Sequence, residues 1–149
     1  FLKMPELTLT VPAEYGYVIL FNGVGTFFTL MYLGGQVMKA RKQYNVQYPN
    51  MYAVPGTEKA NEFNNVQRGH QNALETFPSY LAMSLIGGLK HPIPVAAGGL
   101  CWIVGRVLYM EGYKAGPETR YKKGGGVMWL GVLASMASCV HLAASLLSA

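Results

Sequence analysis

Four long apolar segments restrict this chain to a helical membrane fold. The segments cover about residues 15–38, 64–89, 94–113 and 125–147. A transmembrane helix needs about 20 predominantly apolar residues, so each segment is long enough to cross a bilayer. Only 13% of the 149 residues are charged, which is well below the share of about 25% in soluble domains. We therefore expect an all-α protein, in which residues 1–149 form one transmembrane domain of four helices in up-down order.

The basic residues are concentrated in two of the three connections between these segments. An even number of spans places both ends of the chain on one side of the membrane, so the first and third connections share the other side. That side holds eight basic residues, whereas the side of the termini holds only Lys3 and Lys90. The eight are Lys39, Arg41, Lys42, Lys59, Lys114, Arg120, Lys122 and Lys123. The positive-inside rule then predicts that the first and third connections face the cytosol.

A stripe of polar side chains occupies the first half of the second segment. Arg68, Gln71, Asn72 and Glu75 stand at i, i+3, i+4 and i+7, so a helix brings them to one face. We call these four residues the polar stripe. Ionisable groups at membrane depth are costly, and they normally mark a functional site. The stripe therefore predicts a binding site for a small polar molecule at the cytosolic edge of the membrane.

The end of the third segment reaches the same edge. Arg106, Tyr109 and Tyr113 are spaced i, i+3 and i+7 and share one helical face. Tyrosine is also common at membrane interfaces, which leaves a purely anchoring role open for this pair. We expect Arg106 to pair with Glu111 in helix packing.

The basic connections allow two interpretations. Arg120 follows the third segment, and Arg41 and Lys42 follow the first. Juxtamembrane basic residues of this kind are sufficient to attract anionic lipid headgroups. Alternatively, they bind a ligand together with the polar stripe. A ligand that matches this edge has carboxylates for Arg68 and Arg41 and an amine for Glu75; glutathione fits, but polarity alone does not select it.

The remaining cysteines and histidines show no ligand spacing. Cys101 and Cys139 lie in apolar runs, and His91 and His141 are isolated in the sequence. His70 falls on the helix face opposite Arg68, where it can contact another helix or subunit. We expect no metal ion and no nucleic acid partner.

Several motifs together resemble a known family. Residues 63–75 read FNNVQRGHQNALE, residues 102–109 read WIVGRVLY, and residues 15–18 and 39–42 read YGYV and KARK. These runs resemble the membrane-associated eicosanoid and glutathione metabolism (MAPEG) family. Within the family they are most similar to the type 3 microsomal glutathione transferases, and they are also related to leukotriene C4 synthase.

The resemblance implies a homotrimer of four-helix subunits in the endoplasmic reticulum membrane, with glutathione as co-substrate bound between subunits. It implies a glutathione transferase and glutathione-dependent lipid peroxidase that acts on hydrophobic electrophiles or lipid hydroperoxides, with conjugation of the leukotriene C4 synthase type included. By motif position the glutathione contacts are Arg68, Asn72, Glu75, Tyr109 and Tyr113, with Arg41 and His70 supplied by the adjacent subunit. Arg120 matches the arginine that stabilises the glutathione thiolate.

Two positions depart from the family pattern and keep other functions open. Lys42 stands where the synthase has a second catalytic arginine, and Thr76 stands where it has a tyrosine. Lysine can donate a proton but cannot make the planar bidentate contact of arginine. Lys42 is thus the second catalytic candidate, beside Arg120. Two alternatives remain open. One is a non-catalytic lipid-binding protein like the five-lipoxygenase-activating protein, and the other is a structural membrane protein without a ligand.

Overall fold

All regular secondary structure in the described part of the chain is helical. The computed structural model describes residues 10–148, a range that contains no strand and leaves Lys3 outside. The elements are α1 (Tyr15–Val18), η1 (Ile19–Gly25), α2 (Thr26–Gln43), α3 (Ala60–Gly88), α4 (Pro92–Tyr113), η2 (Pro117–Thr119), η3 (Gly125–Val127) and α5 (Met128–Leu147). Because α1, η1 and α2 follow one another without a break, they make one long helical segment. The predicted all-α fold with four long helical segments is confirmed.

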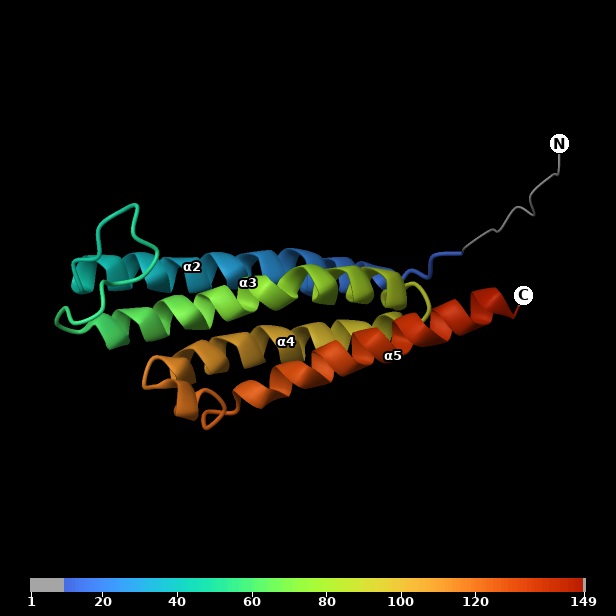
Figure 1. The fold of residues 1–149 in the computed structure, drawn as a ribbon. Coiled ribbons are helices and arrows are strands. Elements are labelled where there is room, and N and C mark those ends of the chain that lie inside the picture. The colour runs from blue at the N-terminus through green and yellow to red at the C-terminus, as the bar shows by residue number, and fades with distance from the viewer. Residues whose placement is uncertain (1–9, 149) are drawn as a thin grey trace.

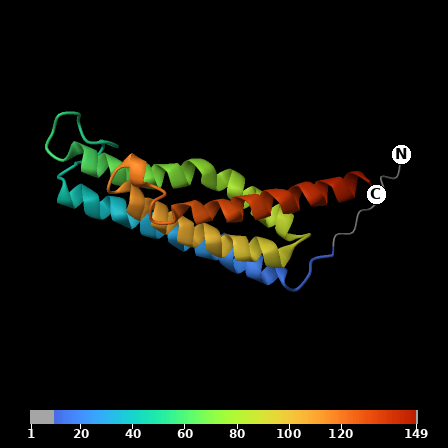
Figure 2. The ribbon, with the colours of Figure 1, turned by 90° about the horizontal axis from the view of Figure 1, so that it is seen from below.

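The four segments form an up-down bundle. They lie side by side along a common direction (Figure 1), and the view from below shows the same arrangement (Figure 2). α4 packs against α5 and α3, and α3 packs in turn against α5 and α2. The end of α2, the start of α3 and the end of α4 lie at one end of the bundle. We call this the site end, since the polar stripe and both candidate tyrosines belong to it.

The surface of the bundle fits a membrane. Three of the segments are long and apolar enough to span one, namely Tyr15–Gln43, Pro92–Tyr113 and Gly125–Leu147. Large apolar side chains remain exposed on α2 and α5, among them Phe28, Met31, Leu133 and Val140. A soluble protein rarely leaves apolar surface of this extent uncovered. The chain is therefore a multi-pass membrane protein, in which the more polar α3 runs beside the three apolar segments.

Two helix boundaries differ from those predicted. α2 continues to Gln43, so Lys39, Arg41 and Lys42 belong to its last turns. Cations at this position are favoured by the helix dipole, which explains why a basic cluster extends the helix instead of ending it. α3 already begins at Ala60 and continues without a break through Pro78.

The first segment contains a π-helical stretch that the sequence did not predict. Asn22 lies at its centre, and its Nδ2 atom donates to the Tyr80 hydroxyl at 2.9 Å and to the Val95 carbonyl at 3.3 Å. The Thr26 hydroxyl donates to the Asn22 carbonyl at 2.5 Å and to the Gly23 carbonyl at 2.9 Å. π-helical turns leave backbone carbonyls poorly paired, and local hydroxyl donors satisfy them. The stretch thus binds the first segment to α3 and α4 through buried polar groups.

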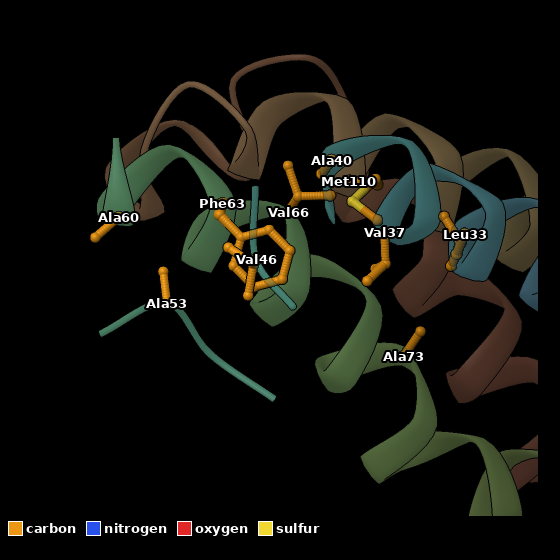
Figure 3. Packing of buried hydrophobic residues seen from close by; sticks show 10 residues of the cluster. All are labelled: Leu33, Val37, Ala40, Val46, Ala53, Ala60, Phe63, Val66, Ala73 and Met110. Carbon is orange, nitrogen blue, oxygen red and sulfur yellow. The ribbon is translucent and has the colours of Figure 1, made fainter. Parts of the chain in front are cut away.

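An apolar cluster fixes the geometry of the site end. Phe63 and Val66 of α3 pack with Met110 of α4, and Val46 and Ala53 from the α2–α3 loop cover them (Figure 3). The remaining members are Leu33, Val37, Ala40, Ala60 and Ala73. Because these contacts hold the start of α3 against the end of α4, the polar stripe and the two tyrosines come to one level of the bundle.

Candidate functional site

The polar stripe forms on α3 as the spacing predicts. Nη1 of Arg68 lies 3.0 Å from Oε1 of Glu75, two helical turns away. The two side chains are 41% and 44% exposed, so they stand at the outside of the bundle. Asn72 lies between them in sequence and is half-buried. The outer side of α3 thus carries a positive and a negative group that are both accessible to a ligand.

The inner side of the stripe is held by an arginine from α4. Nη1 of Arg106 donates to Oδ1 of Asn72 at 2.9 Å, and its Nη2 donates to the hydroxyl of Thr76. Arg106 is only 2% exposed. The expected pair of Arg106 with Glu111 is wrong, because Glu111 accepts from Lys114 at 2.5 Å. A short-range pair with Lys114, the residue that follows α4, takes the carboxylate, while Arg106 faces α3.

Tyr109 and Tyr113 lie at the end of α4 beside an aromatic residue from the following loop. Their ring centroids are 5.6 Å apart, and the ring of Tyr121 stands 5.5 Å from that of Tyr109. The Arg120 guanidinium carbon lies 5.3 Å from the centre of the Tyr121 ring, and its Nη1 donates to the Pro117 carbonyl at 2.5 Å. The structure therefore brings Arg120 to the two predicted tyrosines through Tyr121.

The loop after α4 is folded back by close backbone packing. The Thr119 hydroxyl donates to the Gly112 carbonyl at 2.7 Å, across the last turn of α4. A Cβ atom on Gly112 would stand 2.6 Å from the Thr119 carbonyl oxygen, and one on Gly125 would stand 2.8 Å from the Cα of Tyr109. Gly116 has φ 140°, which side-chain-bearing residues rarely adopt. These glycines allow the loop to lie on α4 and thereby place Arg120 at the site end.

Arg41 and Lys42 stand apart from the polar stripe. Nη1 of Arg41 donates to the Asn50 carbonyl at 2.8 Å, and its guanidinium carbon lies 4.4 Å from the Tyr48 ring centre and 5.4 Å from that of Phe63. Lys42 is exposed and lines a shallow pocket with Arg41 and Tyr48. Within the described chain, the partners of Arg41 belong to the α2–α3 loop and to the start of α3, not to the stripe.

His70 faces away from the stripe, as expected. It is half-buried, and a Cβ atom on Gly34 of α2 would lie 3.8 Å from its Nε2 atom. His70 therefore packs toward α2 of its own chain. The two histidines read as isolated in the sequence meet at the far end of the bundle, where Nε2 of His91 is 2.7 Å from Nδ1 of His141.

The candidate residues thus fall into three groups with one link between them. The stripe residues lie on α3, the tyrosines and Arg120 lie at the end of α4, and Arg41 with Lys42 ends α2. Arg106 joins the first two groups, because its guanidinium carbon is also 5.9 Å from the Tyr109 ring centre. Sequence reasoning missed this role of Arg106 and missed Tyr121. The i, i+3, i+7 spacing of Arg106 with the tyrosines was a usable signal, whereas a single aromatic in a basic loop was not.

The arrangement can bind a small zwitterion at the membrane edge. It offers a guanidinium, an amide and a carboxylate within two turns of α3, and at the end of the adjacent α4 the half-buried Tyr113 beside the buried Tyr109. Charge-assisted hydrogen bonds to such groups are about twice as strong as neutral ones. Apolar helix surface borders the site, so an apolar second molecule can approach from the bilayer.

Fold and site together define a polytopic membrane protein of four helices with a polar site at one end. The chain belongs to the MAPEG family, whose pattern matches residues 19–144. The family predicted from the motifs is confirmed, whereas the placement nearest the type 3 transferases stays a prediction.

Characterised relatives show the same family relationship. Leukotriene C4 synthase of Bos taurus is 31% identical over 90 residues, which are 60% of this chain and 56% of that protein. Microsomal glutathione S-transferase 2 of Homo sapiens is 35% identical over 104 residues, 69% of this chain and 65% of that protein. Leukotriene C4 synthase of Mus musculus is 29% identical over 115 residues, 74% and 73% of the two chains. The chain therefore matches less than two thirds of the length of the bovine and human relatives.

Proposed function

We propose that this protein is a membrane-bound glutathione transferase that also reduces lipid hydroperoxides with glutathione. The observation that carries the proposal is the accessible polar stripe on α3 in a chain of the MAPEG family. Similarity to a leukotriene C4 synthase and to a microsomal glutathione S-transferase supports glutathione as the co-substrate. The four helices then act as one transmembrane domain, which we place in the endoplasmic reticulum.

Glutathione binding follows from the charges on α3. Without a ligand, Arg68 and Glu75 pair with each other. A glutathione carboxylate and the glutathione ammonium group can replace this one ion pair by two, with Arg68 taking the carboxylate and Glu75 the ammonium. Asn72, Tyr109 and Tyr113 supply hydrogen bonds to the peptide between these ends.

A second copy of the chain would complete the site. Arg41 is oriented by its own loop and lies apart from the stripe of its own chain. We place Arg41 at the site of a neighbouring subunit in a homotrimer, where it meets the second carboxylate of glutathione. We place there also the exposed part of His70, whose ring packs toward α2 of its own chain. Lys42, beside Arg41, then stands near the reacting partner molecule.

Activation of the thiol is the task we assign to Arg120. A free thiol has a pKa of roughly 8.5, so only a few per cent is thiolate at neutral pH. Lowering that pKa by about two units requires about 2.7 kcal/mol of preferential thiolate stabilisation. A guanidinium directed at the sulfur in a partly dry site can supply this free energy. Lys42 can donate a proton to the oxygen that leaves or opens when an epoxide reacts.

Two reactions follow from one thiolate. With an aryl halide, the sulfur forms a bond to carbon and the halide leaves as an anion. With an epoxide, the sulfur forms a bond to carbon, the C–O bond breaks and the ring-opened oxygen takes a proton; both reactions give a conjugate. With a lipid hydroperoxide, the sulfur attacks the outer oxygen, the O–O bond breaks and the lipid alcohol leaves. A second glutathione then reduces the sulfenic acid, so that two glutathiones and one hydroperoxide give glutathione disulfide, an alcohol and water.

Product analysis tests the proposal. The purified protein, in detergent or in lipid discs, is incubated with glutathione and one epoxide, one aryl halide or one fatty-acid hydroperoxide. Glutathione conjugates, or glutathione disulfide with the lipid alcohol, are the expected products. Binding of apolar lipid without any such product supports a lipid-binding protein instead and contradicts the enzyme.

A further inference from the structure

Arg106 is a buried cation without a carboxylate partner in the described chain. It is 2% exposed, and its two bonded partners are the amide of Asn72 and the hydroxyl of Thr76. Its guanidinium carbon also lies 5.3 Å from the Trp102 ring centre and 5.9 Å from that of Tyr109. The Nε atom has no hydrogen-bond partner. A buried guanidinium is costly unless it is well bonded, so its orientation depends on two acceptors and two aromatic faces.

Both acceptors lie on consecutive turns of α3 and are connected to each other. The Thr76 hydroxyl lies 3.2 Å from the backbone carbonyl of Asn72, to which it donates. Its hydrogen is therefore directed at α3, and a lone pair remains for Arg106. The side chain of Asn72 and the hydroxyl of Thr76 thus hold the two terminal nitrogens of Arg106 in one fixed plane. Thr76 is the position where this chain departs from the tyrosine of the synthase pattern.

The contact also decides which way the amide of Asn72 points. An amide has one acceptor end and one donor end. Because Oδ1 of Asn72 accepts from Arg106, its Nδ2 group is the end of the amide that is left to donate to a ligand, and the residue is only half-buried. An arginine that only donates excludes the opposite orientation, which would set Nδ2 against a cation.

We propose that Arg106 is a positioning residue that fixes Asn72 as a hydrogen-bond donor to a carbonyl or carboxylate oxygen of the bound peptide. The inference rests on the proposed function, since it assigns a partner within the same glutathione site. Arg106 itself acts through Asn72 and stays inside the bundle. The site thereby selects a ligand that carries an acceptor between its carboxylate and its ammonium group, as a peptide does.

The variant Asn72→Asp removes hydrogen-bond donation to the ligand and keeps the contact with Arg106. The carboxylate keeps the shape of the amide and gives Arg106 the counter-ion it lacks, so the thermal midpoint should stay equal or rise. The donor is lost, so glutathione affinity should fall about tenfold or more. Equal or higher affinity in Asn72→Asp would overturn the proposal, because it would mean that Asn72 accepts a hydrogen bond from the ligand.

A double-mutant cycle tests whether Arg106 acts through Asn72. Glutathione affinity is measured by calorimetry for the full chain, Arg106→Lys, Asn72→Ala and the double variant. Arg106→Lys should weaken binding about tenfold in the parent and less than about twofold in the Asn72→Ala background. Turnover at saturating glutathione should change little, because Arg106 does not touch the sulfur. Equal losses in both backgrounds would show a purely structural role and overturn the proposal.

Two variants of Thr76 supply a second test in case the Arg106 variants do not fold. Thr76→Val removes the acceptor of Arg106 at nearly constant volume, and Thr76→Ser is the matched control that retains it. Weaker binding in Thr76→Val alone is expected, and unchanged binding in both would overturn the proposal. If the parent protein binds no glutathione, the proposed function fails; if it binds but shows no coupling, only the positioning role fails.

Discussion

The ion pair of Arg68 and Glu75 is suited to ligand binding more than to folding. Both side chains are more than two-fifths exposed, and exposed pairs contribute about 0–1 kcal/mol to stability. Breaking the pair is therefore inexpensive for the protein. A zwitterionic ligand that replaces it gains two charge-assisted contacts for the loss of one weak pair.

Arg68→Ala should lower glutathione affinity about ten- to hundredfold, because a charge-assisted hydrogen bond contributes roughly 1.5–3 kcal/mol. The fold should persist, since the pair is exposed. Calorimetric titration with glutathione measures the effect, and Lys90→Ala, an exposed cation at the other end of the bundle, is the control. Unchanged affinity in Arg68→Ala would remove this residue from the site.

Arg120→Ala should lower turnover more than affinity. Its guanidinium would interact more strongly with the thiolate than with the thiol, and removal of one such group typically costs about 10²–10³ in rate. Activity should partly recover at high pH, where glutathione ionises unaided. Stopped-flow measurement of thiolate formation at several pH values checks this, with the exposed neighbour Lys122→Ala as control. Thiolate formation at the parental rate and extent would reduce Arg120 to a lipid anchor.

The residue pattern predicted the stripe but not its inner partner. Arg68 and Glu75 are two turns apart on one helix, and local spacing is sufficient to place them together. Arg106 and Asn72 come from different helices, so their contact depends on how α4 is rotated against α3. The spacing of residues along the sequence does not predict how α4 is rotated against α3. The nearer carboxylate of Glu111 therefore appeared to be the partner, although Lys114 occupies it.

At the scale of elements, α3 combines two requirements. Its first half carries the polar stripe, and its apolar residues Phe63 and Val66 hold it to α4. This polarity keeps α3 out of the set of segments that qualify as spans by hydropathy. The helix is thus held in the bundle by its packing against α2, α4 and α5, and its crossing of the membrane stays a prediction.

The apolar segments of the sequence predicted all four helices and their up-down order, although only three of the helices are apolar enough to qualify as spans. They did not predict the π-helical stretch Ile19–Gly25, because the cause is a tertiary set of bonds between Asn22, Tyr80 and Val95. The same limit applies to His91 and His141, which are remote in sequence and adjacent in space. The periodicity of a sequence predicts single helices, but it does not predict contacts between residues of two different helices.

The connections of the site end should face the cytosol. A cysteine placed at Thr57 in sealed microsomes should react with a membrane-impermeant reagent, and one placed at Ser148 should not. The background should lack Cys101 and Cys139, which are partly exposed thiols. The physical reason is the bias of eight basic residues against two. The opposite labelling pattern would overturn the orientation.

For the whole molecule, the apolar surface is suited to lipid and the polar site is suited to water. Apolar side chains along α2 and α5 are exposed, as contact with lipid requires, while the polar stripe and Arg120 stand at one end of the bundle. A water-soluble peptide and a lipid-soluble partner can therefore meet at the site end. The proposed homotrimer extends this arrangement, since it would bring Arg41 of one subunit to the stripe of another.

Absorbance of the glutathione thiolate tests the central claim most directly. Glutathione is added to the purified protein at neutral pH, and the thiolate absorbance is recorded against a sample with S-methyl glutathione, which cannot ionise at sulfur. We predict a saturable thiolate signal whose pH midpoint lies about two units below that of the free thiol. The signal should be lost in Arg120→Ala at neutral pH. Absence of a thiolate signal at saturating glutathione in the parent protein would contradict the account.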